Sequence, residues 1–296
     1  MQTLESLPSI TRVSSYTGEG KQGYIDELES TLKKYSDLSR QLVSDIILTH
    51  RHHDHTNGLP SVLKLLNGLW PHTSNYVAPR IHKYPILPNE DENVLSLLKG
   101  LSLDIYAKAP DFANLHSLQH AQTLTSPGCT LQVFHTPGHT VDSICLHLSE
   151  ENALFSADTV LGQGTAVFED LSAYMRSLQD MLRLNNQQHR SFERIYPGHG
   201  PIVNDGPKLI KEYIDHRMQR ENQIENLMTT MSSDGYIWTI EELVARIYAN
   251  YPKPLWGPAA GSLQLHLQKL KEDRKVIHLD GQDAGARWVL ASKYSL

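Results

Sequence analysis

Histidines and an aspartate gather in one short stretch near the N-terminal end of the chain. His50 and His52 are two residues apart, and Asp54 and His55 follow at once, in the pattern H-x-H-x-D-H. Side chains two apart at the end of a strand point the same way, so two imidazoles can bind one ion. The turn that follows directs Asp54 and His55 to a neighbouring position, where oxygen and imidazole suit zinc. The spacing predicts a metal site and leaves His53 in a non-ligand position.

Three shorter motifs each place one more candidate ligand after a predicted strand. T-P-G-H-T contains His139, S-A-D-T contains Asp158, and Y-P-G-H-G contains His199. A Pro-Gly-His motif alone is also typical of an ordinary turn. The order of the motifs and the 16 histidines of the chain favour a metal site, because neutral histidine is the commonest metal ligand near pH 7.

The elements that must position these residues are predicted from the spacing of apolar side chains. Strands are expected over 44–50, 129–136, 143–148, 152–159 and 193–199, and helices over 22–40, 58–67, 171–184 and 207–229. Residues 70–120 contain several prolines and a possible helix in ENVLSLLKGL. We expect this stretch to be an insertion over one end of the core.

A change of composition near residue 230 indicates a second domain. Thr239 and Glu242 form a capping box that opens a helix. A second amphipathic helix over 262–275 and a hairpin over 276–291 complete a small module resembling a winged helix. The second helix mixes both signs of charge, so the module either packs on the core as structure alone or reads nucleic acid. The predicted domains are 1–230, which includes the insertion, and 231–296.

Composition narrows the class of protein. The formal charge of −6 and pI near 6.2 argue against a chain built mainly to hold nucleic acid. Cys129 and Cys145 lie in apolar stretches and are expected in the core. The sequence shows neither a membrane-spanning apolar run nor a secretory signal pattern at its start. We therefore expect a cytoplasmic protein without a membrane partner.

The series T-H-x-H-x-D-H, T-P-G-H-T, S-A-D-T and Y-P-G-H-G-P resembles the metallo-β-lactamase superfamily. The resemblance implies an α/β fold, an αββα sandwich, with two zinc ions at one edge between two sheets. Asp54 and Asp158 can both hold a metal and orient the attacking hydroxide, and Asp54 is the expected catalytic residue. The implied ligands of the first zinc are His50, His52 and His139, those of the second are Asp54, His55 and His199, and Asp158 bridges both.

A narrower resemblance rests on GQGTAVFEDL at 162–171, on GPKLIKEYIDHRMQRENQI at 206–224 and on the terminal module. These segments are similar to the β-lactamase-like protein 2 family, which includes an endoribonuclease branch. Related fungal proteins are thioesterases that release aromatic polyketides from an acyl carrier protein. Family members begin with paired strands, whereas here a short segment leads directly into YTGEG at 16–20. We therefore expect shortened N-terminal strands.

The expected function is a zinc-dependent thioesterase of fungal secondary metabolism. Its partner would be an acyl carrier protein or a polyketide synthase product, and residues 70–120 would shape an apolar cleft. An endoribonuclease cleaving single-stranded RNA, guided by the C-terminal module, is the alternative. A truncated, inactive homologue that kept its metal site is a third. The acidic charge favours the thioesterase.

Overall fold

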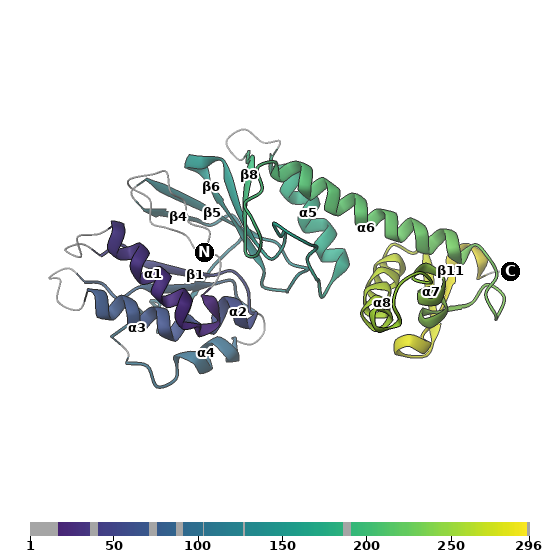
Figure 1. Cartoon of the computed structure of the whole chain (residues 1–296), viewed down its shortest axis with the longest axis horizontal. Coiled ribbons are helices and arrows are strands. Elements are labelled where there is room, and N and C mark those ends of the chain that lie inside the picture. Colours follow the sequence, from purple (N-terminus) through teal and green to yellow (C-terminus); the bar gives the residue numbers. More distant parts are fainter. Residues whose placement is uncertain are drawn as a thin grey trace.

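Two β-sheets lie face to face, with helices on both outer sides (Figure 1). The computed structural model describes residues 17–35, 41–70, 76–86, 91–102, 104–126, 128–185 and 191–294. A long helix leads from the sandwich to a smaller module that contains the C-terminus (Figure 1). The predicted αββα sandwich with a C-terminal module is confirmed, whereas the expected shortening of the N-terminal strands concerns residues 1–16, which lie outside the described residues.

The first sheet is parallel, in the order β1-β2-β3. Its strands are β1 (Asp45–Leu48), β2 (Arg80–Lys83) and β3 (His116–Ser117). The accompanying helices are α1 (Gln22–Tyr35), α2 (His53–Thr56), α3 (Leu59–Leu69) and α4 (Glu92–Leu98). Apolar residues of α1 and α3 pack together with Ile46 of β1. The predicted helix over 22–40 is confirmed as far as Tyr35, and 36–40 lie outside the described residues.

The prediction of an insertion over 70–120 is wrong. This stretch supplies β2 and β3 to the first sheet, together with α4. Its strands escaped detection because β2 buries polar side chains, which interrupt the apolar pattern. His82 and Lys83 are both buried. His82 Nε2 lies 2.6 Å from Asp45 Oδ1, and Lys83 forms ion pairs with Asp91 and Asp142. These pairs compensate for burying the charge.

The second sheet has the order β4-β5-β6-β7-β8. Its strands are β4 (Thr123–Ser126), β5 (Cys129–His135), β6 (Ile144–Leu148), β7 (Ala153–Ala157) and β8 (Arg194–Pro197). Its helices are α5 (Leu171–Asn185) and α6 (Gly206–Met228). Every residue of β6 and β7 is buried, since one face meets the first sheet and the other meets α5 and α6. Continuous apolar runs follow from burial on both faces.

The direction of the strands explains where the motifs meet. Strands β5 and β7 are both antiparallel to β6, and β8 is parallel to β7. The carboxyl ends of β5, β7 and β8 therefore all lie at the same end of the strands of the second sheet. The carboxyl end of β1 lies beside this end of the second sheet, because the N–H of Ile144, the first residue of β6, donates to the carbonyl of Thr49 at 3.0 Å. Each predicted ligand follows one of these four strands.

The C-terminal module packs around its own apolar core. Its elements are β9 (Trp238–Thr239), α7 (Ile240–Ile247), α8 (Trp256–Glu272), β10 (Val276–Asp280) and β11 (Arg287–Leu290). The predicted capping box of Thr239 and Glu242 is confirmed. Helix α6 serves both cores: Ile210 packs in the sandwich, whereas Ile224 and Met228 pack in the module. The domain boundary at residue 230 stays a prediction.

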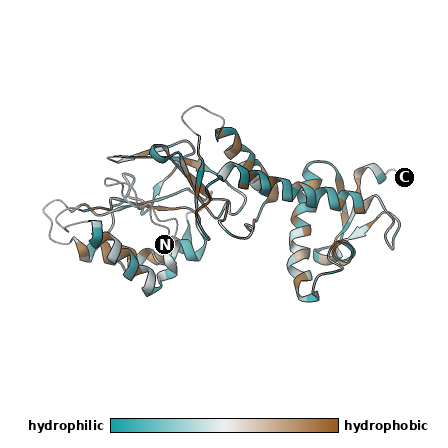
Figure 2. Ribbon diagram, turned by 45° about the horizontal axis from the view of Figure 1, so that its top comes forward, coloured by the Kyte–Doolittle hydropathy of each residue, from teal (hydrophilic) through white to brown (hydrophobic). Residues whose placement is uncertain are grey.

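Hydropathy follows the layers. Brown, hydrophobic stretches run along the strands, while the helices alternate between teal and brown (Figure 2).

Cys129 and Cys145 are buried and free, as expected for core residues. Within the described ranges, no helix is both long and apolar enough to span a membrane.

Candidate metal centre

The predicted ligands come from four places in the fold and meet between the two sheets. His50 and His52 follow β1, whereas Asp54 and His55 lie on the one-turn helix α2. The remaining candidates follow the second-sheet strands β5, β7 and β8 in that order: His139, Asp158 and His199. The seven side chains form two groups that share Asp158. His53 is exposed and belongs to neither group.

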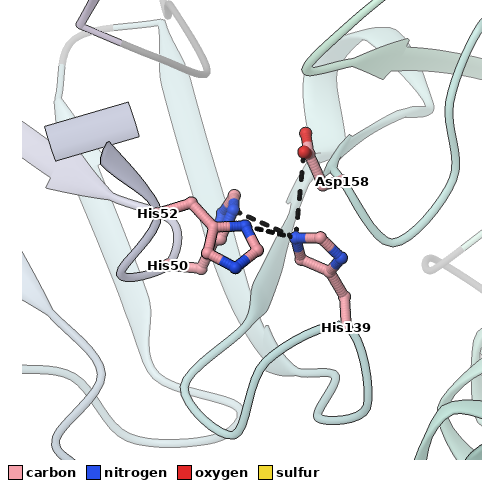
Figure 3. A group of neighbouring side chains, drawn as sticks. All are labelled: His50, His52, His139 and Asp158. Atoms are coloured by element: carbon pink, nitrogen blue, oxygen red, sulfur yellow. Dashed lines mark hydrogen bonds and ion pairs between the residues drawn. The ribbon is translucent and has the colours of Figure 1, made fainter. Parts of the chain in front are cut away.

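Three imidazole nitrogens of the first group converge on one point (Figure 3). His139 Nε2 lies 3.2 Å from His50 Nε2 and 3.0 Å from His52 Nδ1. Asp158 Oδ2 completes the group at 3.8 Å from His139 Nε2. Nitrogens held about 2.1 Å from a tetrahedral zinc ion are separated by about 3.4 Å. The donor set therefore fits a single zinc ion.

The second group pairs two imidazoles with two carboxylates. His199 Nε2 lies 2.8 Å from Asp54 Oδ2 and 3.5 Å from Asp158 Oδ2. His55 Nε2 lies 3.3 Å from Asp54 Oδ2 and 3.2 Å from Asp158 Oδ1. Asp158 thus directs both of its oxygens at ligand candidates, as a bridging carboxylate would. Nitrogen and oxygen donors suit zinc here as well.

The two groups differ in their protonation. Burial lowers the pKa of His50 and of His139, so both imidazoles are neutral. Burial opposes protonation of His55 too, but hydrogen bonds to Asp158 and Asp54 outweigh it and raise its pKa to about 9. The same carboxylates raise the pKa of His199 to about 10. A divalent cation entering the second group therefore replaces protons, as metal binding to histidine requires.

Hydrogen bonds behind the ligands orient two of the imidazoles. His139 Nδ1 lies 2.8 Å from the carbonyl oxygen of Val167 and donates to it. The opposite nitrogen, Nε2, is then free of hydrogen and faces the centre. Thr49 Oγ1 lies 3.2 Å from His50 Nδ1 and acts similarly. Such partners fix the tautomer and the ring orientation of metal-binding histidines.

Glycine is required in both Pro-Gly-His motifs. A Cβ on Gly198 would collide with Asp158 Oδ1 and lie 3.0 Å from His55 Cε1, inside the second group. Gly138 has a φ of +133°, and a Cβ there would collide with the backbone of Tyr174 on α5. The sequence shows these glycines as turn residues only. Their second role is to leave room for the ligands and for the helix.

An ion pair and a carbonyl group beside the centre were missed from the sequence. Glu169 Oε1 accepts a hydrogen bond from Arg51 Nη2 at 2.6 Å, and Arg51 lies between two ligand candidates in the chain. The carbonyl of Val167 accepts from His139. Both belong to the segment GQGTAVFEDL, which the sequence singles out as a family resemblance, but no motif assigns them a partner.

This fold and this arrangement of ligand candidates define a class of protein. Residues 20–199 match the sequence profile of the "Metallo-beta-lactamase superfamily". Residues 239–288 match the "Beta-lactamase associated winged helix domain". The chain belongs to the metallo-β-lactamase superfamily and carries this winged-helix domain at its C-terminal end.

Relatives cover most of the chain. It is 33% identical over 253 residues to the "Beta-lactamase-like protein 2 homolog" of Drosophila melanogaster, covering 86% of this chain and 75% of the relative. It is 31% identical over 288 residues to the "Lactamase-like protein aptB" of Emericella nidulans, covering 96% and 79%. The predicted resemblance to the β-lactamase-like protein 2 family and to fungal lactamase-like proteins is confirmed.

Two solved structures share the fold. A metallo-β-lactamase family protein from Thermus thermophilus has a TM-score of 0.59 at 21% identity, covering 97% of this chain and 92% of that one. A β-lactamase domain protein from Burkholderia ambifaria has a TM-score of 0.63 at 17% identity, covering 92% and 80%. At these identities the likeness supports the fold alone.

Proposed function

We propose that the chain is a zinc-dependent hydrolase that cleaves the thioester between an acyl or polyketide chain and an acyl carrier protein. Membership of a superfamily of metal-dependent hydrolases supports the reaction class. The two ligand groups that share Asp158 support two zinc ions. Bound zinc supplies Lewis-acid catalysis and activates water near neutral pH. The role of the seven residues as ligands is part of this proposal.

Apolar side chains exposed on the loops around the ligand candidates support the choice of an acyl thioester as substrate. Val141 is 51% exposed, Val167 is 70% exposed and Ile202 is 40% exposed. Val141 lies two residues after His139, the carbonyl of Val167 binds His139, and Ile202 lies three residues after His199. Exposed apolar residues at a site favour a substrate with apolar surface to bury. An acyl or aromatic polyketide chain has such a surface.

The charge beside the centre agrees with this choice. The guanidinium of Arg51 is already engaged by the carboxylate of Glu169. Binding a polyanion such as RNA relies on cations that neutralise phosphates. An engaged arginine contributes less to such binding than a free one. A neutral thioester can bind without cations that neutralise phosphates.

The carboxylate of Asp54 suits proton transfer in this reaction. The hydrogen bond from His199 holds the pKa of Asp54 well below its usual range. Asp54 is therefore ionised at neutral pH, and its Oδ2 can accept a hydrogen bond from attacking water and orient it. The leaving group is a thiolate, whose parent thiol has a pKa of about 8.5. Such a group departs without a strong general acid.

Hydrolysis of thioesters of increasing acyl length tests the proposal. With the zinc-loaded protein, kcat/KM should rise several-fold per added methylene over short chains, since each buried methylene contributes about 0.8 kcal/mol. Val167→Asp should flatten this dependence. Val77→Asp is the matched control, because Val77 is 65% exposed and precedes β2 at the opposite end of the first sheet. No hydrolysis above the buffer rate, or no dependence on acyl length, would overturn the proposal.

An endoribonuclease is the second candidate, because the C-terminal module pairs cations with aromatic rings. Lys253 Nζ lies 3.5 Å from the ring centroid of Trp256, and Lys293 Nζ lies 4.6 Å from that of Tyr236. Cations beside aromatic rings suit single-stranded nucleic acid. If labelled single-stranded RNA is cleaved, Lys253→Ala with Lys293→Ala should weaken binding and flatten its salt dependence. A zinc-loaded protein that cleaves neither substrate would instead support an inactive homologue.

A further inference from the structure

Residues 166–170, the bridging segment, bind the two loops that supply the three histidines of the first ligand group. The carbonyl of Val167 accepts from His139 Nδ1 at 2.8 Å. The backbone N–H groups of Glu169 and Asp170 donate to the carbonyl of Gly138 at 2.8 and 3.1 Å. The side chain of Glu169 binds Arg51, which separates His50 from His52 in the chain. The segment is thereby joined to the loops that follow β1 and β5.

The same segment is held from the other side by α6 and α8. Arg217 Nη2, from α6, donates to the carbonyl of Ala166 at 3.2 Å. The guanidinium of Arg217 also lies 4.8 Å from the ring centroid of Phe168. His266, from α8, meets the ring of Phe168 edge-on at 6.4 Å. Arg217 is 7% exposed and His266 is 1% exposed, so these contacts are shielded from water.

The exposed side chain of Val167 does not anchor its own carbonyl. Its neighbours do: Ala166 is buried, and the ring of Phe168 stacks on Tyr174 at 5.4 Å. Arg217 binds both of these neighbours. The position of the carbonyl that orients His139 therefore depends on residues of α6 and α8.

An ion pair joins α6 to α8 beside His266. Glu221 of α6 is 5% exposed, and its Oε1 lies 3.8 Å from His266 Nδ1. Its other oxygen, Oε2, accepts from Lys269 Nζ of α8 at 3.0 Å. The buried carboxylate of Glu221 keeps this pairing with Lys269, because leaving a buried charge without its partner is costly. Helix α8 of the winged-helix domain is therefore fixed to α6 next to the bridging segment.

We propose that Phe168, Arg217 and His266 are positioning residues of the metal centre, through which the winged-helix domain holds the carbonyl that orients His139. The inference rests on the metal centre of the proposed function and is independent of the substrate. It gives the C-terminal domain a role in metal affinity. The domain then acts on the first ligand group, which contains His139, and not on the second.

Zinc affinity of the full chain, measured by competition with a chromophoric chelator, tests this inference. Phe168→Leu removes the ring but keeps an apolar side chain. We expect it to weaken one equivalent of zinc by about tenfold or more, the usual cost of removing support behind a metal ligand, and to leave the other equivalent unchanged. Phe168→Tyr keeps the ring and should retain both affinities. His266→Ala should resemble Phe168→Leu.

Leu243→Ala is the matched control, because Leu243 is fully buried in the core of the winged-helix domain. It should lower the melting temperature and leave both zinc affinities intact. Equal losses from Leu243→Ala and Phe168→Leu, or unchanged affinities in Phe168→Leu, would overturn the inference. Should Phe168→Leu not fold, Arg217→Lys and His266→Ala decide by the same measurement. A wild-type chain that binds no zinc would instead refute the proposed metal centre itself.

Discussion

At the scale of single residues, the two ligand groups use different chemistry. The first group consists mainly of imidazoles that burial keeps neutral. In the second group, the carboxylates of Asp54 and Asp158 raise the pKa values of His55 and His199 and keep both imidazoles protonated. The second group therefore has to lose the protons of His55 and His199 before it can bind a cation. This difference leads to a prediction about pH.

Zinc binding to the second group should be strongly pH-dependent. The pKa values of about 9 for His55 and about 10 for His199 lie above neutrality, so both are protonated at pH 7. Affinity should rise as pH rises toward these values and fall with acid, whereas the first group should change little. Calorimetric titrations with zinc, in buffers of different ionisation enthalpy, should show about two protons released by one equivalent. Equal proton release by both equivalents would contradict this assignment.

Single ligand substitutions should separate the two groups. His50→Ala should lose one equivalent of zinc, and Asp158→Ala should weaken both, because Asp158 belongs to both groups. His53→Ala is the control from the same motif and should keep full metal content, since His53 is exposed and outside both groups. Elemental analysis after gel filtration measures this. A loss of metal in the His53 variant would show that the ligand register is wrong.

At the scale of elements, the loops after the strands can place the ligand candidates together only because glycines in these loops leave room for them. Gly198→Ala should weaken zinc binding, most strongly by the second group, because the added methyl group would displace Asp158, which both groups share, or His55 of the second group. Gly68→Ala is the control, since a Cβ at Gly68, inside α3, meets nothing within 4 Å. It should keep both metals and stabilise its helix by up to about 1 kcal/mol. Full metal content in the Gly198 variant would contradict the close packing.

At the scale of the whole molecule, metal binding should stabilise the fold. The ligands come from both sheets, so an ion held between them favours the folded chain over the unfolded one. Metal at about 100 times its Kd contributes about 2.7 kcal/mol, which raises the melting temperature of a chain of this size by roughly 4 °C. Melting with and without chelator should show this difference, and Asp158→Ala should be nearly insensitive. An identical midpoint for the wild type in both conditions would refute the prediction.

Helix α6 also determines how the molecule can be divided. Its first half packs in the sandwich, and Ile224 and Met228 pack in the winged-helix domain. A chain ending at residue 230 would therefore expose both of these side chains. Point substitutions in the full chain are the cleaner test of what the C-terminal domain contributes.

The sequence by itself determined most elements and the candidate ligands. Apolar spacing reveals β5, β6 and β7 because these strands are buried along their whole length or on alternate residues. The ligand candidates could be predicted because each follows a strand directly in a short motif. Both the apolar spacing and the short motifs involve residues that are close together in the chain, so they could be recognised without knowledge of distant contacts.

Only the tertiary structure decided what depends on distant partners. Strand β2 buries His82 and Lys83, which is favourable only because carboxylates from three other segments pair with them. The carbonyl of Val167 meets His139 across 28 positions of the chain, and Phe168 meets His266 across almost a hundred. A buried polar group is stable when its partner is in place, and folding alone brings such partners together.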